Sequence, residues 1–144
     1  MGKQIYFEDV TEGMEIPTLE KNPTTRQLVQ YAGASGDFYE IHYDKDYAIG
    51  NELPGQIIHG ALKNAWLGQV VTDWIGDRGV LKKLSCQYRG MDEPGAPMYI
   101  KGKVVKKYTE NGENLVDCEI RGENKDGQVT TPGKATVALP SKGG

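Results

Sequence analysis

The sequence of 144 residues has little of what metal, redox and nucleic-acid-binding proteins usually carry. It contains two histidines and two cysteines, in neither an HExxH nor a CxxC arrangement, which argues against a zinc site. The net charge is −3 at pH 7, so there is no cationic surplus to neutralise nucleic-acid phosphates. Apolar runs are short, and none reaches the ~18 residues that indicate a membrane-spanning helix.

Common nucleotide and nucleophile motifs are also missing. The chain has no GxGxxG or GxxxxGK[ST] loop and no GxSxG elbow. The N-terminal segment MGKQIYFEDV is acidic early and lacks an apolar core, so we expect no secretory signal and a cytoplasmic location. Cys86 and Cys118 would be compatible with one disulfide, but two free thiols in a reducing compartment are favoured.

Glycine, by contrast, is abundant. The 19 glycines indicate many tight turns or close backbone approaches. Hydrophobic residues make up 38% and charged residues 26%, which is typical of one folded domain of this length. We expect residues 1–140 to form that domain and residues 141–144 to form a flexible tail.

Two helices are predicted from apolar spacing and end signals. The stronger covers residues 60–75, which are apolar on a broad face and are followed by Gly76. The other covers residues 24–33, with Thr24 as its cap and Gly33 as its stop. Weaker signals predict an extended piece at residues 5–7, turns at Gly13 and Pro17, and a short helix over residues 45–49 between Asp44 and Gly50.

The second half of the chain has the period-two pattern of strands. Turn signals separate the strands at Pro94-Gly95, Asn111-Gly112 and Asp126-Gly127, which predicts an antiparallel meander. Together with the long apolar helix, this pattern predicts an α+β fold, a single hotdog in which a curved antiparallel sheet wraps around one long central helix. Other α+β folds share the pattern. The candidate strands are residues 80–89, 97–109, 114–123 and 128–139.

Asp37 and His42 are the first candidates for chemistry. On a helix, residues at this spacing would lie on different faces, but in a loop opened by Gly36 they can turn toward one point. An acid and an imidazole around one water form a general acid/base pair. The alternative is a capping aspartate and a partly buried histidine satisfied by backbone groups.

Gly60 is the second candidate, because it follows Ile57-Ile58-His59 at the start of the long helix. A glycine there exposes its backbone N–H at the positive end of the helix dipole, which suits the oxyanion of a thioester carbonyl. The alternative is that the turn needs glycine for packing alone. His59 would then anchor the turn as a structural residue.

The motifs GDFYEIH at residues 36–42 and IIHG at residues 57–60 resemble the MaoC-like family of (R)-specific enoyl-CoA hydratases, whose loop reads roughly G-D-x-N-P-[LIV]-H. The resemblance extends over most of the chain, from residues 6–9 to the Pro94-Gly95 turn. It implies a hotdog fold that hydrates trans-2-enoyl-CoA to (R)-3-hydroxyacyl-CoA. The coenzyme A is part of the substrate, and no other cofactor or metal is implied.

By the same resemblance, Asp37 and His42 match the catalytic pair and Gly60 matches the oxyanion donor. The family places its acyl-CoA tunnel at or near an interface, so we expect a homodimer or a heteromer with a second MaoC-like chain. We also predict substrate contacts for Tyr39, Trp66 and Arg89. The alternatives are a loop cover for Tyr39, core packing for Trp66 and solvation for Arg89.

The chain departs from the family pattern in three places. Tyr39-Glu40 replaces the usual Asn-Pro, Gly68 lies where some members carry serine, and Ala96 replaces the aspartate of a Pro-Gly-Asp turn. These changes resemble the small subunits of heteromeric hydratases that act on steroid side-chain enoyl-CoA. They leave open a non-catalytic or partner-dependent hotdog subunit. An acyl-CoA thioesterase is a further alternative on the same fold.

Overall fold

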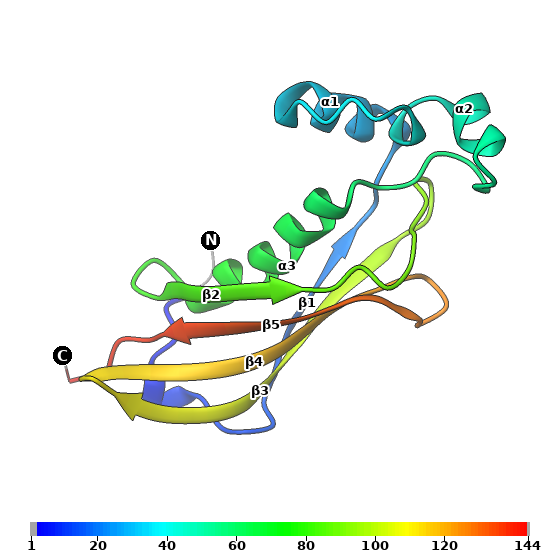
Figure 1. The fold of residues 1–144 in the computed structure, drawn as a ribbon. Helices are drawn as coiled ribbons and strands as arrows, with labels where there is room; N and C mark the ends of the chain where they lie inside the picture. Colours follow the sequence, from blue (N-terminus) through cyan, green and yellow to red (C-terminus); the bar gives the residue numbers. More distant parts are fainter. Residues whose placement is uncertain (1–2, 144) are drawn as a thin grey trace.

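The computed structural model describes residues 3–143. A curved five-stranded antiparallel sheet wraps around helix α3 (Gly60–Ile75), as Figure 1 shows, so the predicted hotdog arrangement is confirmed. No helix in the described part of the chain is long and apolar enough to cross a membrane. The sheet order is β1-β3-β4-β5-β2, with the strands β1 (Glu15–Lys21), β2 (Val80–Cys86), β3 (Met98–Glu110), β4 (Glu113–Glu123) and β5 (Val129–Ala138).

Helix α3 is the centre of the core. Apolar residues cover most sides of this helix, and the curved sheet buries them. Leu67 and Val71 in its middle are fully buried. They pack with inward-facing strand residues such as Ile100 and Val137. The helix ends at Gly76, whose φ of 74° lies in the region that favours glycine, as the sequence predicted.

The predicted hairpin turns form where expected. Asn111 and Gly112 both have positive φ, 51° and 78°, as a two-residue turn between β3 and β4 requires. Gly127, with φ 80°, turns the chain between β4 and β5. These turns place β3, β4 and β5 side by side in chain order.

The prediction of a complete meander is wrong, because β2 pairs with β5 and not with β3. The connection between β2 and β3, residues 87–97, is too long for a tight hairpin and leads the chain from one side of the sheet to the other. Strand β1 was not predicted from the sequence, which indicated a turn at Pro17. Pro17 lies inside that strand, next to a register shift between Ile16 and Leu19, which an edge strand tolerates.

Two local expectations near the N-terminus are corrected. The expected extended piece at residues 5–7 is shorter than predicted: the Tyr6 backbone is extended, with φ −112° and ψ 155°, but a single 3₁₀ turn, η1 (Phe7–Asp9), begins at Phe7. Gly33 does not stop its helix: α1 (Thr25–Ser35) continues to Gly36, whose left-handed φ of 81° ends it. The Thr24 cap is confirmed, since its side chain accepts from the Gln27 N–H.

The expected tail at residues 141–144 has partners in its first half. The Ser141 hydroxyl and the Lys142 N–H donate to the Glu8 carboxylate, and the Lys142 ammonium pairs with Asp9. These contacts hold Ser141 and Lys142 against η1, whereas Gly144 lies outside the described residues.

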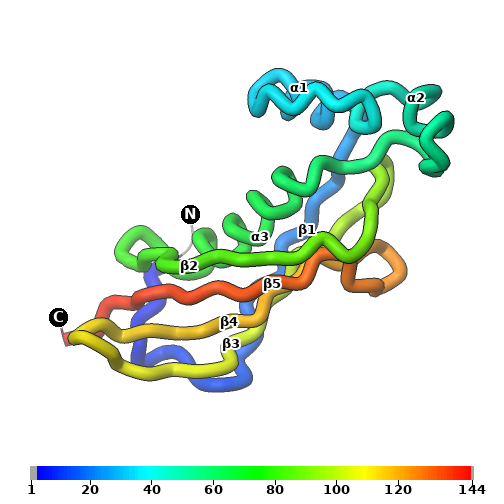
Figure 2. The backbone as a smooth tube through the Cα atoms, in the orientation of Figure 1, coloured from blue at the N-terminus to red at the C-terminus, as the bar shows by residue number. Residues whose placement is uncertain are grey.

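Helix α1, the 3₁₀ turn η2 (Glu40–His42) and helix α2 (Lys45–Gly50) form an overhang beyond the N-terminal end of α3. Figure 2 shows the chain leaving β1, running through this overhang and returning to the start of α3. The Asp44 side chain caps α2 by accepting from the Tyr47 N–H, which confirms that short helix. The overhang and the beginning of α3 carry four of the candidate residues: Asp37, Tyr39, His42 and Gly60.

Candidate active site

Asp37 lies in the turn that follows α1. Gly36 reverses the chain with its left-handed φ, and the Ser35 hydroxyl accepts a hydrogen bond from the Asp37 N–H. Oδ1 of Asp37 accepts from the Tyr39 N–H at 3.3 Å, so the loop itself orients the carboxylate. The side chain is 48% exposed, and its Oδ2 faces His42.

His42 comes from η2 and is buried. Its Nδ1 lies 2.7 Å from the carbonyl oxygen of Ile57, and a carbonyl only accepts, so the neutral ring carries its hydrogen on Nδ1. The Nε2 lone pair is therefore free, 3.8 Å from Oδ2 of Asp37. That distance is too long for a hydrogen bond, so both groups keep a lone pair for a third molecule.

His59 joins the loop to the helix. Its ring is fully buried and stacks on the His42 ring, with centroids 3.8 Å apart and planes 18° apart. Nε2 lies 3.3 Å from the backbone oxygen of Asp37, and the edge of Tyr31 packs against the ring. Burial, with a smaller contribution from His42, lowers the pKa of His59, which keeps this ring neutral at pH 7.

Asp37, His42 and His59 also form a possible metal-ligand set, because one ligand atom from each lies within 4.8 Å of the others. Each histidine, however, already uses one nitrogen on a backbone carbonyl. The remaining nitrogens belong to nearly parallel stacked rings with centroids 3.8 Å apart, so lone pairs that lie in the two ring planes do not meet at one ion. The arrangement fits proton transfer better than metal binding.

Gly60 is the first residue of α3, directly after the His59 cap. Within residues 3–143, no acceptor takes the Gly60 N–H, which lies in the first turn where helix N–H groups are unpaired. The ring of Tyr88 covers this glycine: a Cβ on Gly60 would lie 3.1 to 3.3 Å from three Tyr88 ring carbons. Sequence analysis missed Tyr88, because nothing in its local pattern shows that it reaches the helix start.

The MaoC-like domain model matches residues 9–126, a range that includes the overhang, α3 and the first four strands. The chain belongs to the MaoC-like family. It is 27% identical to an (R)-specific enoyl-CoA hydratase from Rhodospirillum rubrum, over 96% of this chain and 94% of that protein. It is 29% identical to part of the fatty acid synthase subunit beta of Saccharomyces cerevisiae, over 82% of this chain but only 6% of that much longer protein.

Solved structures share the fold of this MaoC-like chain. The (R)-hydratase PhaJ1 from Pseudomonas aeruginosa matches with a TM-score of 0.86 and 21% identity, covering 96% of this chain and 88% of that one. The ChsH1–ChsH2 complex from Mycobacterium tuberculosis matches with a TM-score of 0.78 and 19% identity, covering 90% and 98%. At these identities the likeness establishes the fold.

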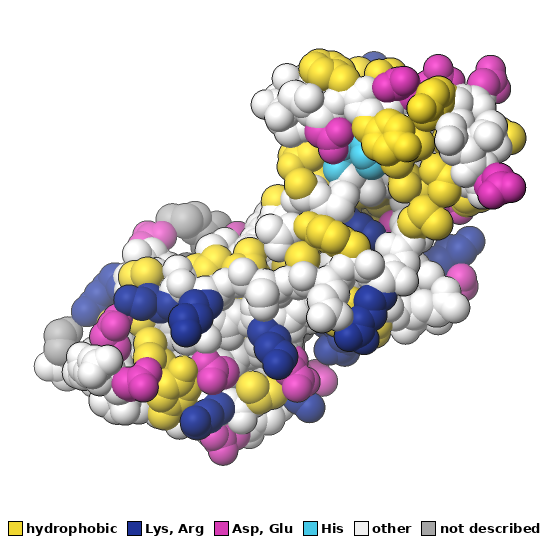
Figure 3. Space-filling model, viewed as in Figure 1, with side chains coloured by type: hydrophobic (Ala, Val, Ile, Leu, Met, Phe, Trp, Pro, Cys, Tyr) yellow, Lys and Arg dark blue, Asp and Glu magenta, His cyan; other side chains and the backbone are white. Residues whose placement is uncertain are grey.

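The structure brings three of the six predicted site residues of this MaoC-like chain close together. Asp37 and His42 face each other, and the half-exposed Tyr39 ring lies nearly perpendicular to the His42 ring, with centroids 6.2 Å apart. Figure 3 shows the histidine surface between acidic and hydrophobic side chains where the overhang meets the body. Gly60 directly follows His59, which contacts the backbone oxygen of Asp37 and stacks on the His42 ring.

Trp66 and Arg89 lie elsewhere. Trp66 is buried among the core residues of α3, where it packs as an ordinary core side chain. Arg89 is exposed after β2, donates to Gln87 and lines a cavity of about 390 Å³ together with Lys134. Their roles in substrate binding stay predictions.

The lowered pKa of His59 predicts a loss of stability in acid. The buried ring resists protonation, so the unfolded chain binds more protons than the folded chain below the usual pKa of 6.5. The free energy of unfolding should therefore fall as the pH drops from 7.5 toward 5.5. Urea denaturation at both pH values should show a smaller fall for His59→Gln, and an equal fall in both proteins would contradict a buried neutral ring.

Proposed function

We propose that this chain is a hydratase that adds water across the trans-2 double bond of an enoyl-CoA to give (R)-3-hydroxyacyl-CoA, and that it catalyses the reverse dehydration. The observation that carries the proposal is the pairing of Asp37 with His42, each with a free lone pair. The unpaired Gly60 N–H directly follows His59, whose ring stacks on that of His42. The enoyl-CoA hydratase relative from Rhodospirillum rubrum supports the substrate class.

In the proposed reaction, the Gly60 N–H donates to the thioester oxygen and stabilises the enolate that forms as C3 is attacked. Asp37 and His42 hold the water between them. One of them takes a proton from this water as its hydroxyl bonds to C3. That proton passes to the other group, which supplies it to C2, so the double bond is saturated and both groups end as they began. The proposal requires no metal and no cofactor beyond the coenzyme A of the substrate.

Three further residues are proposed to contact the substrate. Tyr39 can pack on the acyl thioester, because its ring is half exposed beside His42. Arg89, with Lys134 in the same cavity, offers cations to the coenzyme A phosphates. For Trp66 the proposal is limited to lining the inner end of the acyl site, since the side chain is buried in the core.

We propose further that the chain acts as a homodimer or beside a second MaoC-like chain, in the cytoplasm. The sheet ends in two edge strands, β1 and β2, and an unpaired edge favours association. The overhang exposes Phe38, Tyr39 and Ile49, each at least 50% accessible. The ChsH1–ChsH2 complex is a heteromer with this fold, which supports a partner-dependent subunit as the second candidate.

The acid/base pair is tested by substitution. Asp37→Asn and His42→Ala should each lower kcat/KM for crotonyl-CoA hydration by about a hundredfold or more, because each removes a proton-transfer group. The double variant should be little worse than either single one, since the two groups act on one water. The assay follows loss of the enoyl absorbance, with melting temperatures as the folding control. Full activity in either single variant would contradict the assignment, and release of free thiol would indicate a thioesterase.

The oxyanion role of Gly60 is tested by Gly60→Pro, which deletes the N–H. Proline suits the first position of a helix, and His59 before it has ψ 133°, the extended backbone that a residue preceding proline prefers. We expect kcat to fall about a hundredfold. Gly60→Ala is the matched control, because it brings a Cβ against Tyr88 but keeps the N–H. A folded, fully active Gly60→Pro protein would show that the carbonyl is held elsewhere.

The oligomer is tested by sedimentation. We expect the purified chain to sediment at micromolar concentration as a dimer, or to do so only with a second MaoC-like chain present, since pairing covers the sheet edges. Hydration assays with and without that partner separate the two cases. A stable, fully active monomer would contradict both.

A further inference from the structure

A buried ion pair lies next to the segment that begins α3. Lys63 on α3 and Asp92 in the connection between β2 and β3 are 3% and 4% exposed, and their Nζ and Oδ2 atoms are 2.9 Å apart. Nζ also donates to the Gly90 carbonyl at 3.0 Å, and the Thr130 hydroxyl donates to the same Oδ2 at 2.6 Å. A buried pair often contributes no more stability than apolar residues of the same size would. Stability alone therefore does not explain this pair.

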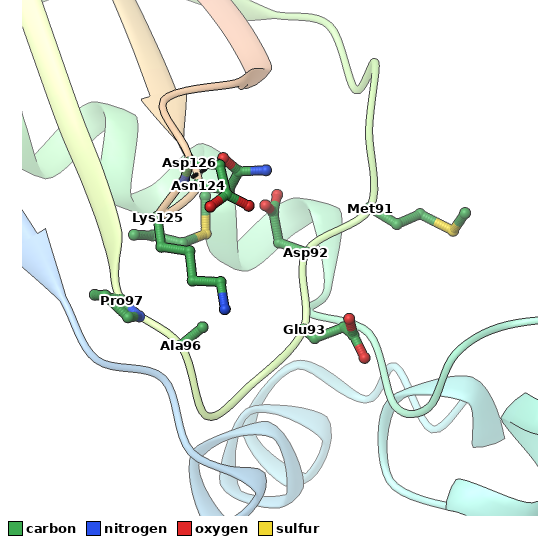
Figure 4. Close-up of a pocket in the computed structure, with 9 residues that line it drawn as sticks. Met91, Asp92, Glu93, Ala96, Pro97, Asn124, Lys125 and Asp126 are labelled. Atoms are coloured by element: carbon green, nitrogen blue, oxygen red, sulfur yellow. Dashed lines mark hydrogen bonds between the residues drawn. The ribbon is translucent and has the colours of Figure 1, made fainter.

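The pair fastens the connection between β2 and β3 to its surroundings. The N–H groups of Arg89 and Gly90 both donate to the Thr130 carbonyl on β5. Gly90 lies so close to this strand that a Cβ would come within 3.0 Å of Thr130. Figure 4 shows the Asp92 side chain directed away from those of Met91 and Glu93. All three residues line a cavity of about 140 Å³. Asp92 therefore turns inward while its neighbours face outward.

Two hydrogen bonds through one peptide group connect the backbone of Asp92 to the His42 ring. Its carbonyl oxygen accepts from the Ile58 N–H at 2.8 Å. That N–H belongs to the Ile57–Ile58 peptide group, whose carbonyl oxygen accepts from Nδ1 of His42 at 2.7 Å. One peptide group thus donates to Asp92 and accepts from the candidate catalytic histidine. Hydrogen bonds in such a series polarise and strengthen one another.

We propose that Lys63 and Asp92 are positioning residues for His42. Their ion pair fixes the Asp92 carbonyl, which fixes the Ile57–Ile58 peptide, which holds the His42 hydrogen on Nδ1 and leaves Nε2 open toward Asp37. Neither side chain touches substrate in this proposal. The inference rests on the proposed function only where it concerns rate, because the state of the His42 ring can be observed without substrate.

The first test observes that ring by ¹⁵N NMR in Asp92→Asn and Lys63→Met. The chain has only two histidines, so the His42→Ala variant assigns their signals. In the unmodified protein we expect His42 with a protonated Nδ1 and an unprotonated Nε2. Both variants should mix the two tautomers, or lose the protected Nδ1–H proton, because the Ile57–Ile58 peptide is no longer held.

The matched controls are Glu123→Gln and Lys101→Met. These residues form an ion pair of the same length, 2.9 Å, between neighbouring strands of the sheet. The same chemical changes there should leave the His42 signals unchanged, whatever they cost in melting temperature. If the control variants shift the His42 signals as much as Asp92→Asn and Lys63→Met do, the effect is general loosening and the proposal is wrong.

The second test is kinetic. Asp92→Asn should lower kcat for enoyl-CoA hydration by about tenfold with little change in KM, because a misplaced histidine slows the chemical step more than binding. Glu123→Gln should stay within about twofold of the unmodified kcat, because the Glu123 carboxylate pairs with Lys101 and Arg121 on the sheet and not with the Ile57–Ile58 peptide. A rise in KM with kcat unchanged would overturn the positioning role.

A milder variant keeps the test decisive if Asp92→Asn and Lys63→Met do not fold. Thr130→Val removes one hydrogen bond to Asp92 and preserves side-chain shape, so it should shift the His42 signals in the same direction and lower kcat less. Unchanged His42 signals in this variant would then overturn the inference.

If the unmodified protein shows no hydration but the NMR shifts occur, the positioning stands and the proposed function fails. If the protein hydrates enoyl-CoA but the variants change neither the NMR signals nor kcat, the proposed function stands and the positioning role fails.

Discussion

The site depends on the hydrogen bond between Nδ1 of His42 and the carbonyl of Ile57. This bond satisfies a buried ring nitrogen, sets which nitrogen carries the hydrogen and ties the overhang to the segment that begins α3. The Ile57 N–H in turn donates to the Ile41 carbonyl, so the two segments are bonded in both directions. Without these bonds the position of the acid and the imidazole relative to the Gly60 N–H would rest on the contacts of His59 with Asp37 and His42.

The stacked histidines make this arrangement asymmetric. His59 is fully buried and held neutral, and it occupies one face of the His42 ring. The tautomer of His42 then leaves one lone pair, at Nε2, and Asp37 faces it. A proton that reaches the histidine pair therefore binds at Nε2 of His42, while the neutral His59 ring packs against it.

Local pattern is sufficient for much of the fold. Helix α3, four of the strands and the Asn111-Gly112 turn follow from apolar period and turn chemistry, which act within a few residues. Asp37 and His42 can be paired from the sequence because loop spacing and the family motif agree. Long-range pairing is not predictable in this way: β2 joins β5, and Tyr88 reaches Gly60, through contacts that no local pattern encodes. Lys63 and Asp92 look like surface charges in the sequence and are buried only because each supplies the other's partner.

In the single chain the candidate site is open to solvent. A backbone N–H stabilises an enolate most strongly where water is excluded and the local dielectric is low. In the single chain, the Asp37 side chain is 48% exposed and Phe38 and Tyr39 beside it are at least half exposed. The proposed hydration needs one bound water and not bulk solvent, which favours a site whose open side is covered. A second chain against the aromatic overhang would supply that wall, and its identity would then shape the acyl site as much as the residues of this chain do.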